Sequence, residues 1–134
     1  MTDPGAPAVH RAAPRRPPRR RVSQTRSYEI ADAAGLVTTG TYDDLSLAEV
    51  DLRMGKHGST LSGLMDAVGT AWTVGLQHGV PLADYVSRFQ GLHAEPSGVT
   101  DDPEIPTATS VFDYLARRLA LDHLPPQDRE ALGP

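Results

Sequence analysis

The sequence predicts an α+β domain, in which a small antiparallel β-meander is followed by about three helices packed on the sheet. Two observations predict this class. Apolar and polar residues alternate with a period of two in short segments between residues 27 and 54, as they do in half-buried strands. From residue 59 onward, apolar residues recur every three or four positions, as they do in amphipathic helices. Strands that precede helices favour an α+β arrangement, so we expect the helices to cover one face of the sheet.

Three strands are expected, over Ser27–Asp32, Leu36–Tyr42 and Leu47–Met54. The middle segment is rich in β-branched residues, and the last alternates apolar with charged side chains. The segment 33–35 and the pair Asp43–Asp44 are expected to form the turns. Short turns between neighbouring strands favour antiparallel pairing, with one face of the sheet in solvent.

Helix signals follow the strands. The loop 55–58 ends at Ser59 or Thr60, either of which suits a helix N-cap, and Gly79 suits the end of this first helix. A second helix is expected from Pro81 or Leu82 to about Gly91. The remaining expectations are a loop over 93–107, a third helix over 108–123 that stops at Pro125–Pro126, and one last turn over 127–132.

Composition limits the chemistry. The 134 residues contain no cysteine, which excludes a disulfide, a cysteine-ligated zinc site and a thiol nucleophile. The apolar fraction is 39% and the aromatic fraction 5%, so the core must consist mainly of Leu, Val and Ala. No apolar run approaches the roughly 18 residues that span a bilayer, and the N-terminus lacks the apolar segment of a secretory signal. We therefore expect a cytoplasmic protein.

Charge divides the chain into two parts. Residues 1–25 contain six arginines and one aspartate, whereas residues 26–134 carry a net charge of −9. The first part is also rich in proline and buries little apolar surface, so we expect a disordered basic arm over 1–25 and a folded domain over 26–134. The arm could contact a nucleic acid or another acidic partner, and the candidate residues are Arg15, Arg16, Arg19, Arg20 and Arg21. A solvated tail or an interdomain linker is the favoured alternative.

A candidate phosphate or nucleotide site lies where the strands give way to the helices. Its candidate residues are Lys56, Gly58, Ser59, Thr60, Arg117 and Arg118. A lysine and two hydroxyls at a helix N-terminus can bind a phosphate through the side chains, the backbone N–H groups and the helix dipole. The spacing is not that of a P-loop, and an ordinary capped turn is the favoured alternative. The two arginines are also expected in a structural role, either near the helix C-terminus or paired with an acidic loop.

Metal sites are not favoured. The histidines at 57, 78, 93 and 123 do not form a two-ligand helical pair. Asp101, Asp102 and Glu104 could bind a divalent cation, but a solvated acidic loop is the favoured alternative.

Two further features concern the first helix. Trp72 is expected in the core. Gly63, Gly69 and Gly75 could allow a strand of the same chain, or a second protomer, to pack closely.

Five runs carry a family resemblance, and they occur in order along the chain. They are KHGSTLSGLMDA over 56–67, GLQHGVPL over 75–82, YVSRF over 85–89, EPSGVTDDP over 95–103 and DYLARRLALD over 113–122. Together they resemble the C-terminal region of adenosylcobalamin-dependent (class II) ribonucleotide reductases, a region known as the TSCPD domain. The strand region and the basic stretch before Ser27 are similar to this family as well. The resemblance covers about residues 15–133.

The resemblance implies a relation to ribonucleotide reduction for DNA synthesis. The long enzymes use adenosylcobalamin to generate a thiyl radical, and a cysteine pair supplies the electrons. Those parts belong to a barrel domain and a cysteine-rich tail, which we expect to be missing here. No catalytic residue of the family matches a position in this chain. We therefore expect no bound cofactor and no independent catalysis.

Three functions remain open. The chain could be an accessory or regulatory module that acts on a reductase catalytic subunit or on a nucleotide. It could be a protein-interaction domain that forms a homo-oligomer or binds another partner. It could bind nucleic acid through the basic arm. No membrane contact is expected.

Overall fold

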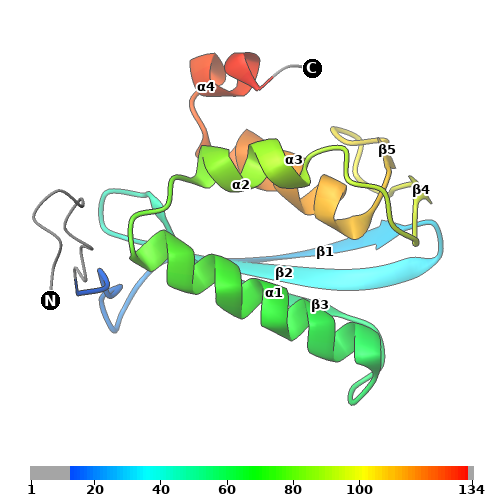
Figure 1. Cartoon of the computed structure of the whole chain (residues 1–134), viewed down its shortest axis with the longest axis horizontal. Helices are drawn as coiled ribbons and strands as arrows, with labels where there is room; N and C mark the ends of the chain where they lie inside the picture. Colours follow the sequence, from blue (N-terminus) through cyan, green and yellow to red (C-terminus); the bar gives the residue numbers. More distant parts are fainter. Residues whose placement is uncertain (1–12, 133–134) are drawn as a thin grey trace, which may run out of the picture.

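A three-stranded antiparallel sheet forms one layer of the domain. The computed structural model describes residues 13–132, and the sheet order is β1 (Ser23–Ile30), β2 (Ala33–Thr41) and β3 (Leu47–Met54). β1 pairs with β2 from Ser23 opposite Gly40 to Ile30 opposite Ala33. Figure 1 shows the strands in this order behind the helices.

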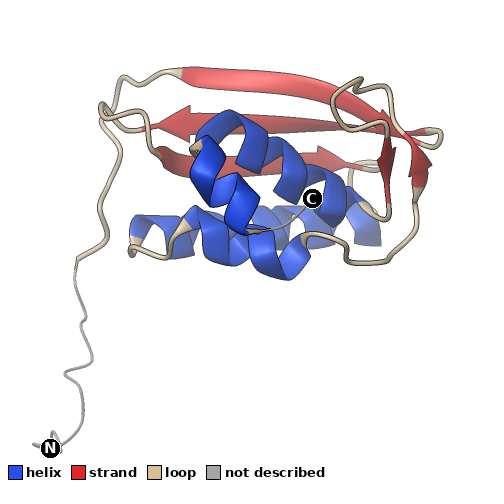
Figure 2. Ribbon diagram, turned by 90° about the horizontal axis from the view of Figure 1, so that it is seen from above, coloured by secondary structure: helices blue, strands red, loops and turns tan. Residues whose placement is uncertain are grey.

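The helices form the second layer. They are α1 (Thr60–Gln77), α2 (Leu82–Phe89) and α3 (Val111–His123). A short α4 (Pro126–Ala131) lies beyond α2 and α3, away from the sheet (Figure 1). Figure 2 shows α1, α2 and α3 on one face of the sheet, and no helix of residues 13–132 lies on the other face. The predicted α+β class, with its meander followed by helices, is confirmed. No helix within residues 13–132 is long and apolar enough to cross a membrane.

The strand boundaries differ from the sequence prediction. β1 begins at Ser23, so residues 23–25 belong to the sheet and not to an arm. Residues 33–35 are not a turn, because the turn is Ala31–Asp32, where Ala31 has a φ of 51°. Gly35 is instead a strand residue, and its missing side chain leaves room for the ring of its cross-strand partner Tyr28.

Two small features lie in the segment predicted as a loop. β4 (Gly98–Val99) pairs with β5 (Thr107–Ala108), and Thr100 bridges to Ile30 at the end of β1. α3 begins at Val111 because Ser110 is its N-cap, three residues later than predicted. The segment 98–110 is therefore tied to the sheet edge and to α3.

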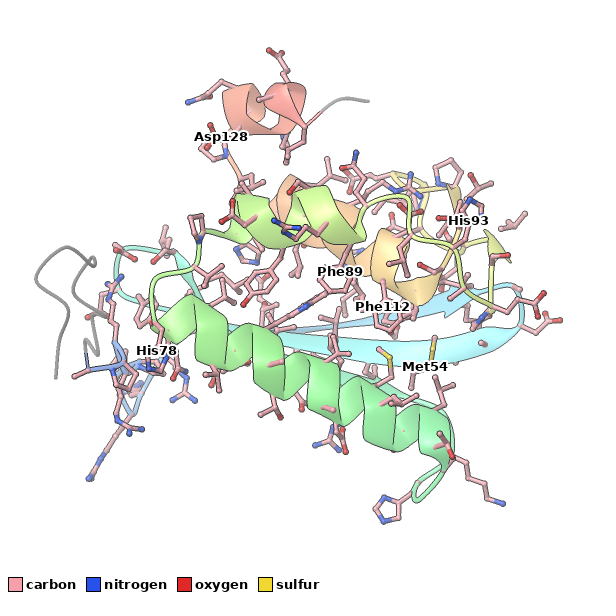
Figure 3. The ribbon with its side chains drawn as sticks, viewed as in Figure 1. Met54, His78, Phe89, His93, Phe112 and Asp128 are labelled. Carbon is pink, nitrogen blue, oxygen red and sulfur yellow. The ribbon has the colours of Figure 1, made fainter. Side chains whose placement is uncertain are left out.

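Aromatic residues join the helices over the sheet. The Trp72 ring of α1 lies 4.9 Å from that of Phe89, which lies 6.1 Å from that of Phe112 (centroid distances). Figure 3 shows Phe89 and Phe112 between the upper helices and the sheet, with Met54 nearby. Trp72 is buried, as predicted.

α1 packs directly on the backbone of β3. A Cβ on Gly69 would lie 3.2 Å from the Val50 carbonyl oxygen, so this glycine allows the close approach of a strand of the same chain. The Thr73 hydroxyl accepts from the Val50 N–H at 3.0 Å and donates to the Val50 carbonyl at 3.1 Å. These bonds cover part of the free edge of β3.

Candidate functional site

The Lys56–Thr60 loop connects β3 to α1 at an exposed end of the domain. It is bent by Gly55 and Gly58, whose φ angles of +86° and +80° lie in the left-handed region that favours glycine. Lys56 and Gly58 are exposed. A phosphate could therefore reach the lysine and the first turn of α1 together.

The same loop also has the contacts of an ordinary cap. The Ser59 side chain accepts a hydrogen bond from the Ser62 N–H at 3.1 Å, and the Ser59 N–H donates to the Lys56 carbonyl at 2.9 Å. One donor of the first helical turn is thus already satisfied by the protein. The geometry is compatible with the phosphate site and with its structural alternative.

Arg118, on α3, is the buried centre of an ion cluster. Its side chain is only 4% exposed and contacts three carboxylates, those of Asp102 at 3.0 Å, Glu104 at 3.1 Å and Asp122 at 2.7 Å. The Tyr114 hydroxyl, one turn earlier, donates to Asp102 at 2.8 Å. We call Asp102, Glu104, Tyr114, Arg118 and Asp122 the Arg118 cluster.

The contacts within the cluster favour the charged forms of Asp102 and Arg118. Burial alone raises the pKa of Asp102, but hydrogen bonds from Tyr114, Arg118 and the Glu104 N–H outweigh it, so the pKa lies below its ordinary value. Burial also lowers the pKa of Arg118, yet its three carboxylate partners raise it above its ordinary value. Arg26 of β1 adds a more distant contact to Asp102 at 3.7 Å. The cluster thus joins the 100–105 loop, α3 and β1.

Arg117 takes part in a second set of contacts, which centres on Asp113. Asp113 accepts from the Gly91 N–H at 2.7 Å and from the Thr109 N–H at 3.0 Å. Arg117 lies 2.9 Å from the same carboxylate and also donates to the Thr107 carbonyl. These bonds fix the end of α2 and the β5 segment to α3.

The structure thus separates the predicted phosphate-site residues into two groups. Lys56, Gly58, Ser59 and Thr60 lie together in the loop before α1. Arg117 and Arg118 make their contacts with α3 and the 102–113 segment, and Arg118 is too buried to reach a phosphate in solvent. Their contacts favour the structural alternative, and the phosphate role of the loop remains a prediction.

The favoured expectation of a solvated acidic loop is wrong for Asp102, whereas Asp101 and Glu104 are exposed. Asp102 is 4% exposed, because it pairs with Arg118. Asp101 accepts from the Glu29 N–H at 2.9 Å and holds the segment against β1. Within residues 13–132, no group of three His, Asp or Glu side chains could hold a metal ion.

The basic arm is partly attached to the domain. Arg15 lies 3.7 Å above the Tyr42 ring and 3.1 Å from Asp44, and Arg21 lies 2.6 Å from Glu49. These contacts hold the described end of the arm beside β2, β3 and the end of α1. The exposed arginines of the described arm include Arg16, Arg19 and Arg20. The predicted disorder of residues 1–12 lies outside the described residues.

Sequence reasoning named three of the five residues of the Arg118 cluster, Asp102, Glu104 and Arg118, and gave pairing with the acidic loop as one structural alternative for the arginine. It did not name Tyr114 or Asp122 as functional positions. The spacing held a signal, since Tyr114, Arg118 and Asp122 recur every four residues and share one face of α3.

The chain was compared with known proteins. The model of the TSCPD domain matches residues 10–123. A vitamin B12-dependent ribonucleotide reductase of Streptantibioticus cattleyicolor is 49% identical over 92% of the chain and 21% of its own length. The Streptomyces coelicolor protein of the same name is 49% identical over 92% of the chain and 13% of its own length. The one from Rhodopirellula baltica is 38% identical over 90% of the chain and 12% of its own length.

The chain therefore spans only a small part of the curated relatives that it matches. No solved structure matches it.

Proposed function

The chain belongs to the TSCPD domain family, and we propose that it serves a vitamin B12-dependent ribonucleotide reductase as an accessory or regulatory domain and not as the catalyst. The observation that carries the proposal is the 49% identity to such reductases over 92% of the chain. The absence of cysteine supports the statement that the chain is not the catalyst. Thiol-based reduction needs thiolates, and these 134 residues contain no cysteine.

The proposed contact with a nucleotide phosphate or with the reductase is the Lys56–Thr60 loop. Three features support this choice: Lys56 is exposed, the loop precedes the N-terminus of an 18-residue helix, and the longest family run begins here. Arg117 and Arg118 are left out, since both are engaged within the domain. Cobalamin (vitamin B12) appears in the names of the relatives, and no step of the proposal requires this chain to bind it.

The test combines the purified chain with the catalytic subunit of the same host's reductase. Co-purification and the rate of ribonucleotide reduction are measured with and without nucleotide. We expect binding, a changed rate, or both, and we expect Lys56→Glu to weaken the effect. Arg88→Glu is the matched control, because Arg88 is an exposed cation on α2, away from the loop. If the wild-type chain neither binds the reductase nor changes its rate, the proposal is wrong.

Nucleic-acid binding by the arm is a second candidate. It is favoured by the anchoring of Arg15 and Arg21, which leaves exposed arginines at a fixed place beside the domain. If Arg16, Arg19 and Arg20 each contact one phosphate, the logarithm of the affinity should fall with the logarithm of salt concentration with a slope of roughly −2 to −3. Replacing these three with alanine should abolish binding. This variant tests the arm better than a truncation at residue 25, which would remove the start of β1.

A further inference from the structure

One edge of the sheet has backbone groups that point into solvent. β1 pairs with β2 on one side only, and Figure 2 shows it as the outermost strand. Along an antiparallel strand, the N–H and C=O groups of successive residues point to opposite sides. Both groups of Glu29 point away from β2, since they bond to Asp101. The groups of every second residue before it, Ser23, Thr25 and Ser27, therefore point the same way, and we call these three residues the β1 free edge.

The β1 free edge has no partner among residues 13–132. No hydrogen bond of that part of the chain reaches its three outward N–H and three outward C=O groups, and residues 23–27 are all exposed. The opposite edge of the sheet differs, because the Thr73 and Gln77 side chains of α1 bond to the backbone of β3. An extended strand with free backbone groups is a template for the addition of another strand.

A short piece of this chain already occupies the other end of the same edge. Thr100 bridges to Ile30 in antiparallel register, and the bonds between Glu29 and Asp101 lie beside this bridge. Residues 99–101 are thus an incomplete fourth strand. In the same register the next partner of Ser27 is Pro103, which has no N–H to donate, so the pairing stops there. The position beside residues 23–27 is left for another strand.

The surroundings of the β1 free edge are acidic. Glu29 and Asp101 are exposed at its C-terminal end. A cavity of about 440 Å³ lies on its helix side, between β1 and α3, and includes Asp122, whose side chain is 33% exposed. Arg26 is the one cation of β1, and it lies 3.7 Å from Asp102. Alternate side chains of an added strand would enter this cavity, so the charges favour basic side chains there.

A second copy of β1 fits these charges less well. If two free edges paired antiparallel about Thr25, Gln24 of each copy would lie opposite Arg26 of the other. The two Arg26 side chains would then be diagonal neighbours on the same face, and like charges at such positions are destabilising. The pairing would also bring two acidic surroundings together. A strand of different sequence, with basic side chains, avoids both conflicts.

We propose that an extended, net basic segment of a partner protein adds to the β1 free edge as a fourth strand, antiparallel to β1 and in line with residues 99–101. In this direction the segment begins beside Asp101, where its first residues meet the acidic end of the edge. Its backbone supplies the affinity, and its side chains in the cavity supply the specificity. The proposal does not depend on the reductase partnership.

Selection of random peptides of about ten residues on the immobilised full chain tests the proposal. We expect the selected peptides to be net basic and to bind more weakly as salt is added. Thr25→Pro should weaken their binding by about tenfold or more, because it removes an outward N–H and leaves the bonds between β1 and β2 in place. Thr25→Ala is the matched control, since it removes the same hydroxyl, which bonds to Thr38, but keeps the N–H.

Amide hydrogen exchange locates the bound peptide. It should protect the amides of Ser23, Thr25 and Ser27 and leave those of β3 unchanged. Urea unfolding checks that the variants fold, and Ser27→Pro, which also removes an outward N–H, replaces Thr25→Pro if that variant does not. The proposal is overturned if no peptide is selected, if the selected peptides are acidic, or if they bind the proline variant as they bind the wild type. Protection of the same amides by self-association of the chain alone would overturn it as well.

Discussion

Two stacked tyrosines illustrate how hydrogen bonding decides the contribution of one residue. The rings of Tyr28 and Tyr114 lie 4.9 Å apart, and both side chains are buried. The Tyr114 hydroxyl donates to Asp102, whereas the Tyr28 hydroxyl has no hydrogen-bond partner within residues 13–132. A buried polar group without a hydrogen-bond partner lowers the stability of the fold, whereas a hydrogen bond to a buried carboxylate raises it.

The two phenylalanine variants should therefore differ in sign. We expect Tyr28→Phe to leave the free energy of unfolding unchanged or to raise it by up to about 1 kcal/mol. Tyr114→Phe should lower it by about 1.5–3 kcal/mol, since a charge-assisted hydrogen bond is lost. Urea denaturation of both variants and the wild type measures the difference. Equal losses in the two variants would show that both hydroxyls are bonded.

The lowered pKa of Asp102 makes stability depend on pH. A carboxyl group whose pKa is lower in the folded state than in the unfolded state stabilises the fold above its unfolded pKa of about 3.9, and this stabilisation is lost as the pH falls further. Asp102→Asn should cost about 3 kcal/mol at pH 7, because it breaks a buried ion pair. It should also make the loss of stability between pH 5 and pH 3 smaller than in the wild type.

Denaturation at three pH values between 3 and 7 tests this expectation. Asp51→Asn is the control, because Asp51 is an exposed residue whose partner Arg53 is exposed too. The control should change stability little at pH 7. A pH profile of Asp102→Asn that runs parallel to that of the wild type would contradict the role of Asp102.

At the scale of the element, two glycines of α1 differ in their surroundings: Gly69 packs against β3, whereas Gly63 has open space beside it. Alanine at position 69 would place its Cβ 3.2 Å from the Val50 carbonyl oxygen and 3.3 Å from the Leu52 nitrogen. Both are backbone atoms of β3, so the helix would have to move away from the sheet. At Gly63, no neighbouring atom lies within 4 Å of the added Cβ.

Gly69→Ala should therefore lower the free energy of unfolding by about 1–3 kcal/mol, despite the better helix propensity of alanine. Gly63→Ala should raise it by about 0.5–1 kcal/mol, because only the propensity changes. Thermal and urea unfolding at dilute concentration measure both. If Gly69→Ala were as stabilising as Gly63→Ala, α1 would not be packed against the backbone of β3.

The elements that the sequence predicts best are those with a strong local signal. The start of α1 and the places of α1 and α2 follow from caps, glycines and apolar spacing. Of the two expected caps, Ser59 and Thr60, the structure selects Ser59, and α2 ends at Phe89, two residues before the expected Gly91. The prediction of the first turn over residues 33–35 is wrong, since the turn is Ala31–Asp32. Gly35 suggested a turn because glycine is common in turns. Its actual role depends on the Tyr28 ring across the hairpin, which a local pattern does not contain.

The Arg118 cluster was harder to predict because its contacts join distant segments. Asp102 and Arg118 are 16 residues apart, and Arg26 lies in β1. A carboxylate in a proline-containing segment is usually solvated, so burial of Asp102 could not be expected from composition. The periodic part of the cluster on α3 could be found from spacing. Pairing of Arg118 with the acidic loop was one of two structural alternatives, and the choice between them required the tertiary structure.

At the scale of the whole molecule, a basic segment lies on an acidic domain. Arg15 and Arg21 connect the segment to Asp44 and Glu49, and hydrogen bonds from Ser46, followed by that of Arg15, lower the pKa of Asp44 to about 2. The Arg15 N–H also donates to the Gln77 carbonyl at the end of α1, and the Tyr42 hydroxyl donates to the Arg15 carbonyl. The segment therefore contacts both layers of the domain.

This arrangement predicts that two arginines of the segment stabilise the fold, whereas three others do not. The double variant Arg15→Ala/Arg21→Ala should lower the midpoint of urea unfolding, and the loss should shrink with added salt, because exposed ion pairs are screened. The triple variant Arg16→Ala/Arg19→Ala/Arg20→Ala should unfold as the wild type does, although it removes more positive charge. Unfolding in low and high salt distinguishes the classes. A triple variant that is less stable than the double variant would mean that net charge, and not the anchoring contacts, connects the arm to the fold.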